Sequence, residues 1–459
     1  MKKHNANNTL IINILNYISM KLIPLIGLIL LMASCTDSDN QTESPRGFVR
    51  VTNGQFTINK EPYRFIGVNY WYGMYLGAEG NESGRERLVR ELNELQALGV
   101  NNLRIQASSE GDSLSLFGVK PALQDSLGNL DEKLLVGLDF LLAQMAERNM
   151  YAVLVLNNYW PWTGGMAQYN KWYGGGEIPY PNETGESWGK YMSYTSEFIK
   201  NEEANDAYKA FIKKLVIRKN TLTGTVYKND PTIMAWQLAN EPRGGSSEED
   251  REIFINWLGE TAEYIKDLDK KHLVSVGSEG IVGHLLNADD YFQAHKSKYI
   301  DYLTLHLWPE TWQMYDKFKP EESFEFAKDT CEKYLLAHLE MAKKLNKPAV
   351  LEEFGLARDN GAYSPDSAII WRNKFFEWIF AYYAENSENY KHFAGINIWG
   401  WSGEGRPAEP GAAWKTGDVL IGDPPHEPQG IFAIYNSDML SLQLIANANR
   451  QIGFKPKKE

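Results

Sequence analysis

Short apolar runs alternate with longer amphipathic stretches along most of this chain, from Phe48 to the C-terminus. The runs are brief and mostly apolar, which is typical of a parallel strand covered on both faces rather than of a helix. The predicted strands are residues 65–71, 101–107, 151–158, 233–242, 273–280, 302–309, 348–355 and 393–401.

The stretches between these strands carry apolar residues at helical spacing. The predicted helices are residues 84–98, 131–149, 202–218, 247–270, 321–345 and 366–384, with 437–452 closing the chain. No Gly/Ser-rich or Pro-rich linker interrupts the alternation, so the pattern predicts one α/β domain, a (β/α)8 TIM barrel. Residues 48–63 contain Asn53-Gly54 and predict a small hairpin that caps the barrel bottom.

The first 35 residues have the pattern of a secretory signal. Lysines precede an apolar stretch, 22–32, that is too short to span a bilayer comfortably. The stretch runs through Leu31-Met-Ala-Ser into Cys35, which resembles the lipobox of bacterial lipoproteins, where the cysteine becomes the lipidated N-terminus. A plain signal peptide with an incidental cysteine is the alternative, and the protein would then be secreted.

We therefore predict a lipoprotein signal peptide over residues 1–35, a polar tether over 36–47 and a catalytic barrel over 48–459. The expected location is the cell envelope, with Cys35 anchored by lipid to a bacterial membrane, the outer one being favoured. Cys331 would be alone in the mature chain and could form no intramolecular disulfide. Its apolar neighbours predict a core residue.

The net charge and the amino-acid composition limit the kinds of molecule that this protein is expected to bind. The formal net charge of -12 disfavours nucleic acid and anionic membrane surfaces, because both attract basic proteins. A neutral substrate fits better, and we expect a monomer. Aromatic residues make up 13% of the chain, with 14 Trp, and several of the Trp lie at predicted strand ends. Most of them are expected in the core, but those beside Gly and Pro in loops could stack on sugar rings.

Two carboxylates end two of the predicted strands. The run Ile233-Met-Ala-Trp-Gln-Leu-Ala stops at Asn240-Glu241-Pro242, and Pro348-Ala-Val-Leu stops at Glu352-Glu353-Phe-Gly. A TIM barrel keeps its chemistry at the C-terminal ends of its strands. A pair of carboxylates there is the minimum equipment for cleaving a glycosidic bond.

Other side chains with possible functions also lie at the C-terminal ends of predicted strands. At the remaining strand ends we find Arg104, Asn157, Asn158, His306, Trp308 and Trp399. A buried arginine needs an anion, and Glu353 is the natural partner, which would keep that carboxylate ionised. The alternative for Arg104 is a purely structural ion pair, and for His306 a core histidine. No Cys/His cluster has metal-ligand spacing, so neither metal nor cofactor is expected.

These motifs resemble glycoside hydrolase family 5, and within it the β-mannanases, over nearly the whole chain from Phe48. The resemblance is carried by Asn240-Glu241-Pro242, Glu353-Phe-Gly355, Asn157-Asn-Tyr-Trp160 with Gly164-Gly-Met-Ala-Gln-Tyr169, His306-Leu-Trp-Pro309, Trp399 and Gly422-Asp-Pro-Pro-His-Glu-Pro-Gln-Gly430. It implies a retaining endo-β-1,4-mannanase acting on mannan, glucomannan or galactomannan. Glucanase activity and a non-catalytic glycan-binding lipoprotein are the alternatives.

The resemblance also implies roles. Glu241 would be the acid/base, Glu353 the nucleophile and Asn240 the group that holds the sugar 2-hydroxyl. Substrate contacts are further expected from Arg104, Asn158, His306, Trp308, Trp399, Trp71 and Trp160. Trp162, Trp172, Trp312, Trp401 and Trp414 are additional stacking candidates.

Three positions leave questions open. Glu352 competes with Glu353, but side chains alternate along a strand, so only one of them can face the barrel mouth. The family often has Tyr where this chain has Trp308, which cannot donate a phenolic hydrogen bond to the nucleophile. The loop after the last strand, about thirty residues rich in Gly and Pro, is expected to carry Arg406, Trp414 and His426 over the cleft.

Overall fold

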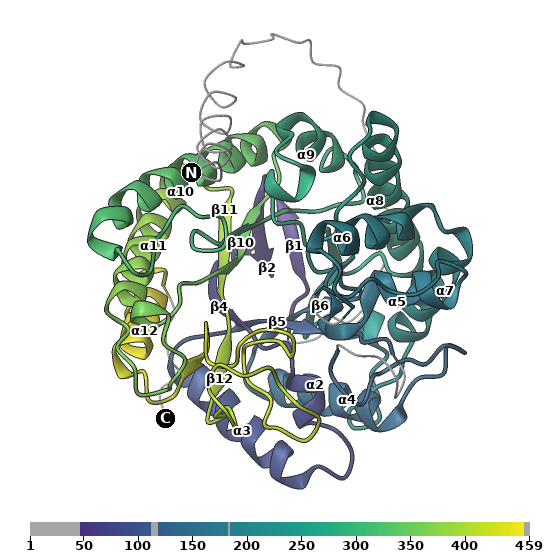
Figure 1. Ribbon diagram of the computed structural model, residues 1–459, viewed down its shortest axis with the longest axis horizontal. Coiled ribbons are helices and arrows are strands. Elements are labelled where there is room, and N and C mark those ends of the chain that lie inside the picture. The colour runs from purple at the N-terminus through teal and green to yellow at the C-terminus, as the bar shows by residue number, and fades with distance from the viewer. Residues whose placement is uncertain (1–45, 112–117, 182–183, 454–459) are drawn as a thin grey trace. The chain divides into compact units, whose positions relative to one another are not determined.

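Eight parallel strands form a nearly closed barrel in the computed structural model (Figure 1), which describes residues 46–111, 118–181 and 184–453. Neighbouring strands pair in the order β8-β7-β6-β5-β4-β11-β10-β9. Backbone hydrogen bonds connect the two ends of this sheet: Asp301 N–H, just before β9, donates to Val274 O in β8 at 2.8 Å, and His306 N–H in β9 donates to Glu279 O, beyond the end of β8, at 3.1 Å. The predicted TIM barrel is confirmed. Its strands are β4 (Phe65–Asn69), β5 (Asn102–Gln106), β6 (Tyr151–Val155), β7 (Ile233–Gln237), β8 (Leu273–Ser275), β9 (Leu303–Leu307), β10 (Ala349–Phe354) and β11 (Phe393–Ile398).

Helices surround the barrel, and all seven predicted ones are present with shifted ends (Figure 1). They are α3 (Glu82–Ala97), α4 (Glu132–Glu147), α7 (Glu202–Val216), α8 (Glu248–Leu268), α10 (Pro320–Leu345), α11 (Ile370–Asn389) and α12 (Met439–Gln451). Polar caps fix several starts: Ser247 and Asp250 form a capping box at α8, and Asp131 accepts backbone N–H groups at α4.

Short helices were not predicted, because they are too brief for a clear apolar period. They are α2 (Gly73–Leu76), α5 (Gly165–Trp172), α6 (Trp188–Ser196), α9 (Ala288–Ala294) and the 3-10 turns Pro161–Thr163, Glu197–Lys200, Tyr227–Asn229, Val282–His284 and Asp359–Gly361. Two of them, α5 and α6, belong to the long β6–α7 connection, which supplies several residues of the site.

The barrel bottom is capped as predicted, but by three strands rather than a hairpin. These are β1 (Val49–Thr52), β2 (Gln55–Ile58) and β3 (Glu61–Pro62), paired antiparallel. Phe56 packs edge-on against Tyr302 with ring centroids 5.2 Å apart, and Tyr302 directly precedes β9. This apolar plug closes the end of the barrel opposite the strand ends that carry the chemistry.

The barrel and its cap belong to one unit of the chain, Phe48–Glu459. The predicted signal peptide and Cys35 lie outside the described residues, as does most of the tether. Among the described residues, no helix has the length and apolar character needed to cross a membrane. Cys331 is a free thiol in the core, as predicted, and its burial raises its pKa to about 12.

Candidate active site

Glu241 and Glu353 come together at the mouth of the barrel. His306 lies between them, with its Nδ1 2.5 Å from Oε1 of Glu241 and 3.3 Å from Oε2 of Glu353. The three donor atoms, one from each residue, lie within 4.8 Å of one another. Retaining glycosidases hold their carboxyl groups about 5 to 5.5 Å apart, whereas inverting enzymes need a wider gap for water. The spacing here is that of a retaining pair.

The backbone at Glu241 is strained. Its φ of 52° lies in the left-handed region, which a residue with a side chain seldom adopts. The conformation persists because the Glu241 N–H donates to Gly277 O at 2.9 Å while Asn240 N–H donates to Asn157 O at 2.9 Å. Such strain is common at functional sites, where neighbouring structure over-determines the chain. It turns the Glu241 carboxyl into the mouth.

Arg104 binds the nucleophile candidate from below, as predicted. Its Nη1 donates to Oε1 of Glu353, and Nη2 donates to Asn240 Oδ1 at 2.8 Å. Its Nε donates to Gln237 Oε1 at 2.7 Å. One guanidinium therefore orients both Glu353 and Asn240 while lying 97% buried itself. Arg104 does not line the cavity, so it supports the site instead of facing a substrate.

Glu352 points away from the mouth, and Glu353 is the member of the pair that lines the cavity. Both Glu352 oxygens accept from Gln237 Nε2, at 2.8 and 2.7 Å, and its Oε2 lies 3.7 Å from Arg104 Nε. The pairing with β9 shifts register between Leu351 and Glu353, which places Glu353 opposite His306. Burial, opposed by Arg104, raises the pKa of Glu352 to about 7.

The two catalytic candidates differ in their partners. Burial raises the pKa of Glu241, whose carboxyl contacts the neutral indoles of Trp160 and Trp308 and the imidazole of His306. Burial also raises the pKa of Glu353, but His306 and the Arg104 cation oppose the rise. Burial lowers the pKa of His306 to about 4, so the imidazole is neutral near pH 7. With only one full positive charge in direct contact, the negative charge belongs on Glu353 and the proton on Glu241.

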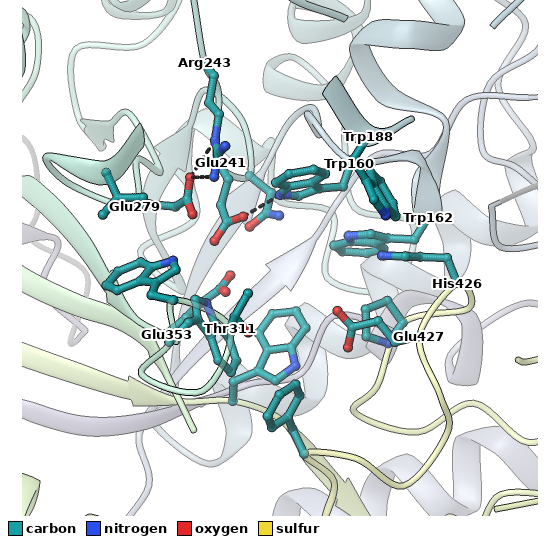
Figure 2. A pocket seen from close by; sticks show the side chains of 17 residues that line it. Trp160, Trp162, Trp188, Glu241, Arg243, Glu279, Thr311, Glu353, His426 and Glu427 are labelled. Atoms are coloured by element: carbon teal, nitrogen blue, oxygen red, sulfur yellow. Dashed lines mark hydrogen bonds and ion pairs between the residues drawn. The ribbon is translucent and has the colours of Figure 1, made fainter. Parts of the chain in front are cut away.

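A cavity of about 460 Å³ opens over this pair, a size usual for ligand sites (Figure 2). Aromatic rings dominate its surface, and polar groups point in from several sides. It is lined by Trp160, Trp162, Trp188, Asn240, Glu241, Arg243, Glu279, Val282, Trp308, Thr311, Trp312, Glu353, Trp399, Pro424, His426, Glu427 and Phe432.

Several predicted contact residues lie behind this surface. Asn158 Oδ1 accepts from Asn240 Nδ2 at 3.2 Å and from the Trp160 N–H at 3.0 Å, so it supports two residues that face the cavity. Trp71 donates to Gly422 O at 3.0 Å and packs on Trp162, with centroids 5.3 Å apart. His306 is fully buried between the carboxylates. These three residues therefore lie behind the cavity surface instead of on it. Their side chains contact the residues that line the cavity and help to fix the positions of those residues.

Some expectations about Trp and Arg side chains were wrong. Trp401 is fully buried, and neither Trp172 nor Trp414 lines the cavity. Trp414 donates to Asp418 O at 3.0 Å within the loop, and Arg406 donates to Asn436 Oδ1 at 2.8 Å. Each of these polar side chains is satisfied locally, so of the three loop residues expected over the cleft only His426 reaches it.

Trp308 takes part in the site through the acid/base candidate. Its hydrogen bond to Glu241 lowers the pKa of that carboxyl, and its ring packs edge-on against Trp399 with centroids 6.1 Å apart. The nucleophile candidate accepts from Arg104 instead, and its other carboxyl oxygen lies 3.3 Å from Nδ1 of His306. Arg104 and His306 thus contact Glu353 although this chain lacks the tyrosine hydroxyl that the family often has at the position of Trp308.

Sequence reasoning missed an ion pair on one side of the cavity. Arg243 Nε donates to Glu279 Oε2 at 2.7 Å, and the guanidinium lies 5.1 Å from the ring centroid of Trp160 (Figure 2). Burial raises the pKa of Glu279 to about 7. Glu279 closes a predicted strand and Arg243 follows Glu241 by two residues, so their positions could have been noticed. Trp188 and Glu427 had no comparable signal, because both lie in irregular connections.

The Glu241, His306 and Glu353 donor atoms are close enough to hold a cation. Two carboxylates and an imidazole would suit a transition metal such as zinc. Each donor already has a hydrogen-bond partner, however, and cleavage by a carboxylate pair requires no metal.

Comparisons with known proteins agree with this geometry. Residues 46–457 match the family model described as GH family 5 beta-mannosidase-like. Mannan endo-1,4-beta-mannosidase 7 of Arabidopsis thaliana is 31% identical, over 77% of this chain and 78% of its own. Mannan endo-1,4-beta-mannosidase 5 of Solanum lycopersicum is 31% identical, over 71% and 75%.

A solved structure is similar as well. The glycoside hydrolase family 5 mannosidase from Rhizomucor miehei superposes with a TM-score of 0.81 at 35% identity, covering 89% of this chain and 98% of its own. The retaining carboxylate pair at the ends of β7 and β10 and the match over nearly the whole barrel lead to one conclusion. This chain is a glycoside hydrolase that belongs to family 5, in its β-mannosidase-like group.

Proposed function

We propose that this enzyme hydrolyses internal β-1,4-mannosidic bonds in mannan, glucomannan or galactomannan, with retention of configuration. The carrying observation is the close approach of Glu241 and Glu353, within 4.8 Å, at the base of a Trp-lined cavity. The names of the Arabidopsis and tomato relatives support the mannan backbone as substrate. Retention follows from the short carboxyl separation.

In the first step, Glu241 gives its proton to the leaving glycosidic oxygen while Glu353 attacks the anomeric carbon. The C–O bond breaks as the bond from the Glu353 oxygen forms, so a glycosyl-enzyme results. Glu241, now ionised, then takes a proton from water, which attacks the same carbon and releases Glu353. The starting state needs a proton on Glu241 and a charge on Glu353, the distribution that their different partners favour.

Supporting residues prepare this step. Asn240 is held by Arg104 and Asn158, so its amide is fixed where the family motif implies a contact with the sugar 2-hydroxyl. Trp399, 5% exposed at the cavity floor, offers an apolar face for the sugar being cleaved. Preorganised donors of this kind stabilise the transition state without rearrangement during the reaction.

A β-1,4-glucanase would use the same fold and carboxylates, and a non-catalytic glycan-binding protein could keep the same cavity. Reducing-sugar release from mannan, carboxymethyl-cellulose and xylan, measured side by side, separates the three. We expect release from mannan well above the other two. Equal rates on cellulose and mannan would contradict the proposal, and release from none of them would favour binding alone.

We also propose that the protein is a lipid-anchored monomer of a bacterial cell envelope. The supporting observation is the Leu31-Met-Ala-Ser-Cys35 run after a short apolar stretch, followed by a polar segment before the barrel begins. Attachment at the envelope would keep the enzyme near a polymeric substrate outside the cell.

A further inference from the structure

Basic residues gather at the bottom of the barrel. The bottom consists of the cap and of the segments that lead from a helix into the next strand, at the end opposite the mouth. These segments, which we call the basic face, contain thirteen Lys and Arg but only four Asp and Glu, although the whole chain has a net charge of -12. The basic face comprises residues 48–64, 98–101, 148–150, 217–232, 269–272, 295–302, 346–348 and 390–392.

The mouth of the barrel has the opposite charge. The segments that lead from a strand into the next helix contain nineteen Asp and Glu and ten Lys and Arg among their described residues. They include the long connection after β11, with its short strands β12 (Trp401–Gly403) and β13 (Ile434–Tyr435). The described mouth segments are residues 70–81, 107–111, 118–131, 156–181, 184–201, 238–247, 276–287, 308–319, 355–369 and 399–438.

Helix dipoles explain only part of this asymmetry. Acidic residues favour the first turn of a helix and basic residues the last turn, as in α10, which ends with Lys343 and Lys344. The basic face lies outside the α-helices, however. Its cap contains no helix, yet Arg50 and Lys60 are exposed there, and Lys298 is exposed four residues beyond the end of α9. These cations therefore need another explanation than the helix dipole.

The acidic residues of the basic face are mostly withdrawn from solvent. Asp230 and Asp269 are buried, and Asp301 forms an ion pair with Lys266 at 2.6 Å. Glu61 is the acidic residue of these segments that remains exposed. Three lysines of the basic face are exposed and make no side-chain hydrogen bond or ion pair with another described residue: Lys60, Lys270 and Lys296. This surface thus presents free positive charge to a partner.

The barrel unit begins at this same face. Lys271 Nζ lies 5.8 Å from the ring centroid of Phe48 and donates to Asn229 Oδ1 at 3.0 Å, so the first residue of the unit lies among segments of the basic face. The predicted tether, residues 36–47, leads directly into Phe48 and can span at most about 40 Å. A lipid on Cys35 would therefore keep the basic face close to the bilayer.

We propose that the basic face docks on a bilayer surface of anionic lipids, so that the mouth of the barrel points away from the membrane. This inference rests on the proposed lipid anchor and identifies the partner of a surface that the hydrolytic reaction does not use. Anionic headgroups attract basic side chains, each of which contributes about five-fold to binding near the surface. The same headgroups repel the acidic mouth, so docking leaves the cavity open to a polymer outside the membrane.

The first test uses the lipidated full-length protein, reconstituted into vesicles of phosphatidylcholine alone or mixed with phosphatidylglycerol. An environment-sensitive dye is attached to an introduced cysteine, either Thr52→Cys in the cap or Met439→Cys at the start of α12, both at exposed positions. Cys331 is buried and Cys35 carries lipid, so neither competes for the dye. On anionic vesicles, we expect blue-shifted emission and quenching by a lipid-borne quencher at position 52 but not at position 439. On neutral vesicles both responses should be weak.

Charge reversal provides the second test. A basic-face variant of the Thr52→Cys protein should have its docking equilibrium constant lowered by roughly 100-fold, so the response to anionic vesicles should disappear. It combines Lys60→Glu, Lys270→Glu and Lys296→Glu. A mouth variant with the same change in net charge should keep the response, because its three lysines are exposed on mouth segments and do not line the cavity. It combines Lys190→Glu, Lys319→Glu and Lys415→Glu.

The outcomes separate docking from anchoring and from catalysis. Equal responses on neutral and anionic vesicles, a basic-face variant that still responds, or a stronger response at position 439 would overturn the inference. Mass spectrometry that finds no lipid on Cys35 would overturn the anchor, and docking is then judged by co-sedimentation of the wild type and the basic-face variant with the same vesicles. Absence of wild-type binding to anionic vesicles would overturn docking. A wild type inactive on mannan would overturn the mannanase proposal and leave docking intact.

Discussion

The guanidinium of Arg104 and the carboxylate of Glu353 form an ion pair beneath the barrel mouth, with side chains only 3% and 4% exposed. Among the described residues of the site, this pair is the single direct contact between a full positive charge and one of the two carboxyls that we propose to be catalytic. It distinguishes two glutamates that burial would otherwise make alike.

Replacing Arg104 with Met should therefore impair both activity and stability. The variant leaves Glu353 buried without a cation and Glu352 without its neighbour, and breaking a buried ion pair costs about 3 to 5 kcal/mol. We expect kcat/KM on mannan to fall by roughly 100-fold or more and the Tm to fall with it. Arg90→Met is the control, because Arg90 pairs with Glu404 at the exposed surface. Unchanged activity in Arg104→Met would refute the assigned role.

The adjacent glutamates should respond differently to removal. Glu353→Ala is expected to abolish turnover while the barrel remains folded, because the covalent step is lost. Added azide should then release an activated mannoside as the inverted product. Glu352→Ala should keep measurable turnover and lose stability, since Glu352 binds Gln237 inside the barrel. An inactive Glu352→Ala beside an active Glu353→Ala would reverse our assignment.

The pH dependence of kcat/KM should change when the positive charge of Arg243 is removed. The acid/base works when protonated, so kcat/KM falls as the pH rises through the pKa of Glu241. The Arg243 cation lowers that pKa. Arg243→Gln removes the charge and should move the alkaline limb of the profile to higher pH, while the acid limb, set by protonation of Glu353, should move less. Arg251→Gln is the control, since Arg251 pairs with Asp290 and neither residue lines the cavity. A shift to lower pH would contradict the argument.

The loop that follows β11 has a tip, residues 408–418, that does not line the cavity. Gly411 N–H donates to Gln429 O at 2.8 Å, and Trp414 N–H donates to Pro425 O at 3.2 Å. Replacing residues 408–418 with a short Gly linker should release the segment that holds His426 and Glu427. We expect kcat/KM to fall far more than Tm, because the tip contributes little to the barrel core. Parallel losses in activity and Tm would mean that the tip is mainly structural.

The proposed lipid attachment uses the thiol of Cys35. Cys35→Ala should move the full-length protein from membrane to soluble fractions and leave its specific activity unchanged, because acylation affects only the anchor. Fractionation followed by a mannan assay measures both. Membrane retention of the variant would exclude the lipoprotein proposal.

The sequence by itself was enough to predict the barrel architecture and to identify Glu241 and Glu353 as the carboxylates at its mouth. Apolar runs of strand length, interrupted at Asn240-Glu241-Pro242 and at Glu353-Phe-Gly355, carry their own signal, because local hydrophobic periodicity and the strand-end rule need no tertiary information. The Arg104–Glu353 pair was also predictable, since a buried arginine needs an anion.

The tertiary structure decided which side chains face the cavity and which support it. Trp71 and Asn158 lie one layer behind, Trp401 is buried in the core, and Glu427 reaches the site from a loop that has no periodicity. Side-chain direction at a strand end or in an irregular loop depends on contacts between segments far apart in the chain. Hydrophobic patterning records whether a residue is buried, but not whether it is buried against protein or against a sugar.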